Sequence, residues 1–175
     1  MIAKSVEVSG WDEPSEPLLL PLSNVGCDEF ERALLPIVRD LNMTCVNPDM
    51  GNWLPVYGRA EKLWGAQTGL PLVYGLSQIV VSLVRIKGEK LDILIASDAW
   101  AQGVTHHEQL LLLMIHHMRR GHTQAGCDFL LDLLDGEMDT KLMNEALAFA
   151  RRHSCGTPLL HTHDGVVGNR LRAVD

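Results

Sequence analysis

The chain has 175 residues, of which 46% are hydrophobic and 21% are charged, and its formal net charge is −7. This length predicts one globular domain over residues 1–175, with enough apolar residues to fill a hydrophobic core. The composition excludes a wholly disordered chain. The negative charge argues against nonspecific nucleic-acid binding, because the average field repels a phosphate backbone.

The cysteines and the N-terminal residues suggest a compartment. The four cysteines are far apart in the sequence and form no C-x-x-C pair, so their spacing predicts neither a disulfide framework nor a zinc ribbon. The N-terminal residues lack the apolar core of a signal peptide, and we find no apolar run of membrane-spanning length. We therefore expect a cytoplasmic protein with no membrane contact.

Residues 1–26 predict an arm punctuated by prolines. After a short strand over residues 5–8, the chain carries three prolines in close succession, which prevent a regular helix. Next to them, Leu18, Leu19 and Leu20 form an apolar run. We expect this run to lie across the body of the protein or to contact a protein partner, and a homodimer would cover it equally well.

A first helix is predicted to begin at Asp28, because Asp28 and Glu31 have the spacing of a capping box. Apolar residues then recur at helical spacing as far as Leu41. Pro36 falls inside this pattern, which predicts a helix that is kinked or shorter than its apolar residues suggest.

Residues 43–56 are rich in Asn, Pro and Gly and predict a loop that contains Trp53. Its length and its bulky aromatic residue make it a candidate binding loop for a protein partner. The alternative interpretation is a surface connection with one anchoring tryptophan.

Residues 78–97 contain two β-branched runs around a charged turn with a glycine. This pattern predicts a small antiparallel β-hairpin. A helix is the competing interpretation of the first run, because Ile79, Leu83 and Ile86 also fit one helical face.

Three consecutive helices are predicted over residues 105–153. Thr105 and Glu108 form a capping-box pair before an apolar run, and Gly121 ends that helix. Two further helices follow, over about 124–135 and 139–153, each ended by a glycine-containing turn. Residues 157–175 predict an irregular tail. The fold class expected is therefore α+β, with a helix-rich C-terminal half and one hairpin.

All eight histidines lie between residues 106 and 163. Near the C-terminus, four donors fall within a short stretch and make a candidate zinc site: His153, Cys155, His161 and His163. Neutral imidazole and thiolate suit zinc at tetrahedral geometry. The alternative is a solvated tail with several histidines, because the spacing matches no standard zinc finger.

The sequence contains no phosphate-binding glycine loop and no complete catalytic set. The expected function is therefore non-enzymatic: an acidic adaptor, chaperone-like or regulatory protein that binds a protein partner through Leu18, Leu19, Leu20 and Trp53, without a cofactor. The main alternative is a zinc protein, hydrolytic in one version. A third interpretation is a nucleic-acid-linked regulator that uses Arg170 and Arg172.

Overall fold

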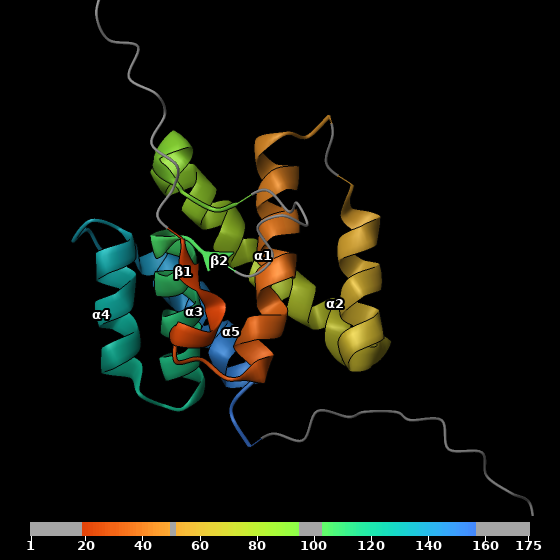
Figure 1. The fold of residues 1–175 in the computed structure, drawn as a ribbon. Coiled ribbons are helices and arrows are strands. Elements are labelled where there is room, and N and C mark those ends of the chain that lie inside the picture. The colour runs from red at the N-terminus through yellow and green to blue at the C-terminus, as the bar shows by residue number, and fades with distance from the viewer. Residues whose placement is uncertain (1–18, 50–51, 95–102, 157–175) are drawn as a thin grey trace, which may run out of the picture.

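The computed structural model describes residues 19–49, 52–94 and 103–156, and five helices dominate it (Figure 1). The helices are α1 (Glu29–Val46), α2 (Trp53–Lys87), α3 (His106–Arg119), α4 (Thr123–Leu133) and α5 (Thr140–Arg152). The remaining elements are β1 (Leu20–Pro21), β2 (Gly103–Val104) and the short 3-10 helices η1 (Leu22–Asn24) and η2 (Gly88–Lys90).

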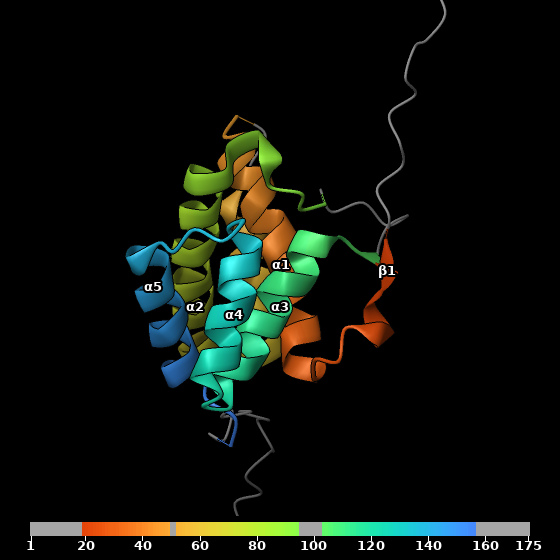
Figure 2. The same cartoon turned by 90° about the vertical axis from the view of Figure 1, so that its left-hand side faces the viewer.

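The helices enclose one main apolar core. α1 packs on α2, α3 packs on α4, and α5 lies against both α2 and α3. β1 and β2 form a two-stranded antiparallel sheet in which Leu20 pairs with Val104. This sheet lies at the edge of the helical body, beside the start of α3 (Figure 2). A second, smaller apolar cluster fills the space beneath it, where Leu20 packs against a set that includes Leu35 and Leu112.

The prediction of a helix-rich chain is confirmed, but the helices are not confined to the C-terminal half. The three helices expected over residues 105–153 are present as α3, α4 and α5. α1 also begins where its capping box predicts, and it continues through Pro36 to Val46. Pro36 therefore does not shorten the helix. The strand expected over residues 5–8 and the tail over 157–175 lie outside the described residues.

The predicted hairpin over residues 78–97 is wrong, because α2 extends to Lys87 and η2 follows it directly. Ile79, Val80 and Leu83 are fully buried on the inner face of α2. The strand propensity of the β-branched Ile79 and Val80 is a weak preference that tertiary burial at helical spacing overrides. The antiparallel sheet that does exist joins β1 to β2 instead.

The predicted loop over residues 43–56 is also largely wrong. α1 extends to Val46 and α2 begins at Trp53, so both ends of the expected loop are helical. Asn52 caps α2, because its side-chain oxygen accepts a hydrogen bond from the backbone N–H of Leu54. The asparagine that indicated a loop is thus an N-cap residue.

α2 consists of two helical halves that meet at Gly65, whose φ of 72° is in the left-handed region. Figure 1 shows the first half beside α1 and the second half passing behind it. The halves touch where Gly69 faces the backbone of Ala60, and a Cβ added at Gly69 would lie 2.5 Å from the Ala60 carbonyl oxygen. Glycine at position 69 therefore allows a close backbone contact that holds the bend.

The segment Trp53–Lys90 is long and apolar enough to cross a membrane by length and composition alone, and half of its most apolar window is buried inside the protein. No apolar run of this length was predicted from the sequence. A core helix of a soluble protein meets the same criterion, and α2 contributes much of the main core.

Replacing Gly69 with Ala should destabilise the protein by about 1–3 kcal/mol, because the new methyl group meets backbone atoms that cannot rotate away. The matched control is Gly58→Ala in the first half of α2, where an added Cβ meets nothing within 4 Å. That variant should be more stable by about 0.5–1 kcal/mol, because alanine loses less backbone entropy in a helix. Urea unfolding of both variants tests this, and equal stability of the two would contradict the close contact.

Candidate functional site

A buried network of charged side chains joins the start of α1 to the end of α3. Glu31 is fully buried, and its carboxylate accepts a hydrogen bond from Arg119. Asp28 accepts a hydrogen bond from Arg120 at 2.5 Å. Burial alone would raise the pKa of Asp28. Hydrogen bonds with Glu31 and from Arg120, together with the nearby Arg119 charge, outweigh burial and hold the pKa of Asp28 well below its usual range. The Arg119 guanidinium also lies over the Phe30 ring, 3.6 Å from its centroid.

A second buried ion pair joins the same two helices, and in this pair the arginine is on α1 and the glutamate is on α3. Arg39 of α1 donates two hydrogen bonds to Glu108 at the start of α3, at 2.7 and 2.8 Å. Glu108 also accepts hydrogen bonds from the backbone N–H groups of Thr105 and Leu94. α1 and α3 are thus antiparallel, and an ion pair fixes each end of their contact.

One set of three potential metal ligands occurs in the described part of the chain: Asp28, Glu31 and His116, whose ligand atoms lie within 4.8 Å of one another. Arg119 and Arg120 already neutralise both carboxylates. A cation would have to displace two guanidinium groups, so this cluster is a structural ion-pair network. His116 joins it through Nδ1, which lies 2.9 Å from the Arg120 guanidinium.

The described members of the predicted zinc site have different surroundings. His153 is 5% exposed, and its ring packs against Phe149 and Phe30. Cys155 is exposed, while His161 and His163 lie outside the described residues. Burial, together with the positive charges of Arg152 and Arg119, lowers the pKa of His153 to about 4.

Two hydrogen bonds, one from a side chain and one between backbone groups, tie the end of α5 to α3. The Arg119 side chain donates through Nε to the carbonyl of His153 at 2.6 Å. The backbone N–H of Cys155 donates to the carbonyl of Arg119 at 3.0 Å. The position of α5 therefore depends on the same arginine that pairs with Glu31.

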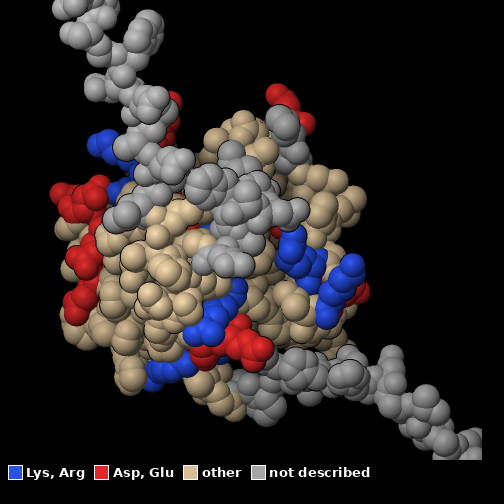
Figure 3. Space-filling view, in the orientation of Figure 1, with Lys and Arg blue, Asp and Glu red and all other residues tan. Residues whose placement is uncertain are grey.

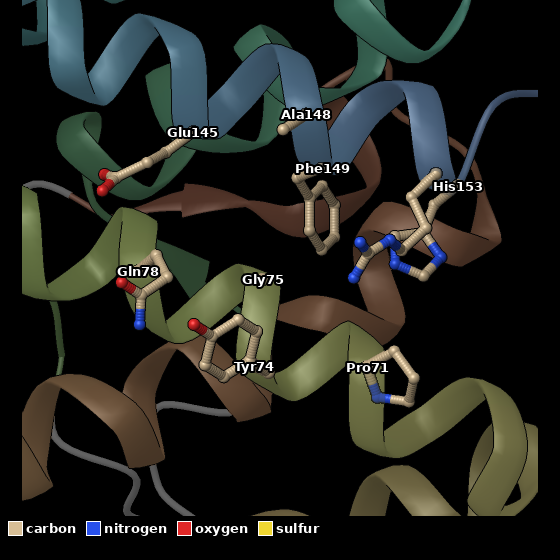
Figure 4. Close-up of a pocket in the computed structure, with 9 residues that line it drawn as sticks. Pro71, Tyr74, Gly75, Gln78, Glu145, Ala148, Phe149 and His153 are labelled. Carbon is tan, nitrogen blue, oxygen red and sulfur yellow. The ribbon is translucent and has the colours of Figure 1, made fainter.

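A pocket of about 130 Å³ lies between α2 and α5 (Figure 4). The ring of Phe149 points from α5 toward Gly75 of α2, and a Cβ added at Gly75 would lie 3.0 Å from that ring. Nine residues line the pocket: Pro71, Tyr74, Gly75 and Gln78 from α2, and Glu145, Ala148, Phe149, Arg152 and His153 from the α5 side. Its walls are mostly apolar, with polar groups at both ends.

Exposed apolar side chains concentrate on α2. Of the nine large apolar residues that are well exposed in the described part of the chain, seven lie on this helix. In its second half, Leu70, Tyr74 and Val81 are 43%, 60% and 43% exposed. Their separations of four and seven residues place them on one helical face. We call these three residues the α2 stripe, and Tyr74 is also part of the pocket wall.

The residues predicted to bind a partner lie elsewhere. Leu19 and Leu20 are half-buried at the small sheet, and Leu18 lies outside the described residues. Trp53 is 39% exposed at the first position of α2, and the adjacent Leu54 is 77% exposed. The α2 stripe and the pocket were not predicted from the sequence, because a helix was only the competing interpretation of part of the segment that carries them.

Comparison of the sequence with protein-family models and with curated proteins, and of the fold with solved structures, found no match.

Replacing Glu108 with Gln should lower the free energy of unfolding by about 3 kcal/mol, because it removes the carboxylate charge from the buried pair with Arg39. Glutamine retains an oxygen that accepts the Thr105 N–H, so the capping box is kept. The exposed Glu61→Gln variant is the control and should change stability by less than about 0.5 kcal/mol. A loss below about 1 kcal/mol in Glu108→Gln would show that the buried pair contributes little.

Protonation of His153 should destabilise the fold. Its pKa of about 4 is below the value of about 6.5 in an unfolded chain, so between these pH values the unfolded state binds the extra proton. Stability should therefore fall as pH falls through this range, by up to about 1.4 kcal/mol per pH unit from this group, and this contribution should level off below pH 4. Denaturant unfolding across the range should show a smaller slope for His153→Phe than for wild type. The control is His106→Phe, which alters an exposed histidine, and an unchanged slope in His153→Phe would contradict the assignment.

Proposed function

We propose that this protein is a non-enzymatic binding module, an adaptor or chaperone-like protein, that recognises a protein partner through the outward face of α2. The observation that carries the proposal is the concentration of exposed apolar side chains on this one helix. Exposed apolar residues that occur singly are normal on a protein surface, whereas contiguous ones are typical of interaction sites.

The inner face of α2 already supplies the packing that the fold needs. Leu72, Leu76 and Leu83 are fully buried there, so the helix is held without any contribution from its outer face. The α2 stripe thus adds apolar surface that folding leaves in water. Burial of such surface against a partner would contribute about 25 cal/mol per Å².

A protein partner fits this face better than a lipid surface does. The α2 stripe borders a pocket with aromatic walls and a defined volume, and charges of both signs surround it, including Glu145 and the Arg85–Asp139 ion pair. A shaped pocket with mixed charges matches a protein surface, whereas a bilayer presents no side chain to fill it.

The proposal is tested by placing a photoreactive phenylalanine analogue at Tyr74 and, as a control, at the exposed Gln124 of α4 in separate protein samples. A partner that crosslinks only from position 74 in cells is then purified, and its affinity is measured by calorimetry. Replacement of Leu70, Tyr74 and Val81 together with Ser should weaken binding at least tenfold, which corresponds to about 1.4 kcal/mol.

The matched control replaces two exposed apolar residues that lie outside α2, Val46→Ser with Met138→Ser. It should bind the partner as wild type does. Equal affinity of the stripe variant and wild type would contradict the proposal. Equal crosslinking from both positions, or binding of the purified protein to anionic phospholipid vesicles through the stripe, would also contradict it.

A further inference from the structure

The pocket between α2 and α5 has the size of one side chain. Its volume of about 130 Å³ is close to the ~150 Å³ of apolar cavities that accommodate a benzene ring. Sites for small-molecule ligands are larger, at roughly 300–1,000 Å³. The pocket therefore suits a single anchoring residue from a larger partner, with Phe or Leu as the side chains of matching size and polarity.

The α2 stripe determines the shape of the segment that carries this anchor. From Leu70 to Val81 it extends for about 16 Å at the rise of a regular α-helix. A second helix with apolar residues at i, i+4 and i+7 presents a line of side chains about 10 Å long, which fits within this length. An extended peptide would need a free strand edge to pair with, and the pocket and stripe lie wholly on helices and the helix-end residue His153.

The charge beside the pocket selects an acidic segment. Arg151 and Arg152 are exposed in the last turn of α5, and neither forms an ion pair with another described residue. Arg152 lines the pocket, whereas Arg151 does not. Figure 3 shows a group of acidic side chains along the edge formed by α4, with further acidic side chains elsewhere on the same face. α4 has no Lys or Arg. A carboxylate next to the anchor would thus meet the Arg152 guanidinium, whereas Glu145, which lines the other end of the pocket, already pairs with Lys141.

We infer that the pocket binds the anchor residue of an acidic amphipathic helix: a Phe or Leu side chain fills the space between Tyr74 and Phe149, and a Glu or Asp one turn away pairs with Arg152. This inference rests on the proposed function, because it names the partner that the α2 face would recognise. The buried anchor supplies most of the affinity, and the exposed ion pair supplies orientation and selectivity.

The test uses two stapled helical peptides of about 16 residues. Both carry Leu, Phe and Leu at i, i+4 and i+7, and they differ only in having Glu or Gln one turn after the Phe. Titration of ¹⁵N-labelled wild-type protein should give shifts that centre on Tyr74, Gly75 and Ala148. The Glu peptide should bind about fivefold more tightly than the Gln peptide, as expected for one exposed ion pair.

Two substitutions on the rim of the pocket separate its apolar and charged parts. Ala148 is exposed, so Ala148→Phe fills the pocket from its edge and should weaken both peptides at least tenfold. Asn144→Phe, on the same helix but outside the pocket, is its control and should leave binding unchanged. Arg152→Glu should abolish the preference for the Glu peptide, whereas the neighbouring Arg151→Glu should preserve it.

Failure of this inference is distinguishable from failure of the proposed function. Wild-type protein that binds neither peptide, or Ala148→Phe that binds both normally, overturns the pocket assignment. Equal binding of the two peptides overturns the acidic partner. A concentration-dependent dimer in sedimentation that Ala148→Phe dissociates also overturns it, because a second copy of the chain would then be the occupant. In each case the proposed function still stands if the stripe variant loses the crosslinked partner.

Discussion

Glu31 and Glu108 each perform two tasks at one end of the α1–α3 contact. Each closes the capping box of its own helix by accepting its N-cap backbone N–H, and each accepts a guanidinium from the other helix. Such pairs cost desolvation energy, and their net contribution to stability is small compared with what is lost when one partner is removed. Their geometric effect is larger. Because the two acids lie at helix starts and pair with arginines of the facing helix, the antiparallel order of α1 and α3 and their register satisfy all four charges together.

The rest of the structure depends on this arrangement through Arg119. Its side chain pairs with Glu31, lies over Phe30 and donates to the carbonyl of His153, while its own carbonyl accepts from Cys155. The end of α5 is thereby attached to the α1–α3 pair. α5 forms one wall of the pocket and α2 forms the other, so the ion-paired Arg119 that holds the end of α5 also helps to hold that wall in place. His153 connects the ion-pair network with the pocket, because it lies near the Arg119 charge and also lines the pocket.

Local signals in the sequence predicted the parts of the fold that local chemistry determines. The capping boxes at Asp28 and Thr105 located the starts of α1 and α3, because an N-cap acid or hydroxyl with a glutamate three residues later satisfies the exposed N–H groups of any helix start. The pairing of those same glutamates with arginines 69 and 88 residues away in the sequence could not be predicted, because no local pattern specifies which distant helix faces which. The pocket is of the same kind, since it exists only where α2 and α5 meet.

The wrong prediction of a hairpin over residues 78–97 has a more specific cause, and this cause bears on function. A helix that only supports a core is amphipathic, and its apolar residues recur at one face. In α2 the buried Ile79 and Val80 are followed by the exposed Val81, so the apolar residues form a continuous run that is typical of a buried strand. Val81 obscures the helical period, and it is a residue that the packing of the core does not need. Disagreement between local pattern and final structure is expected where a sequence serves a task other than folding, and in this chain it falls on the helix face that we assign to the partner.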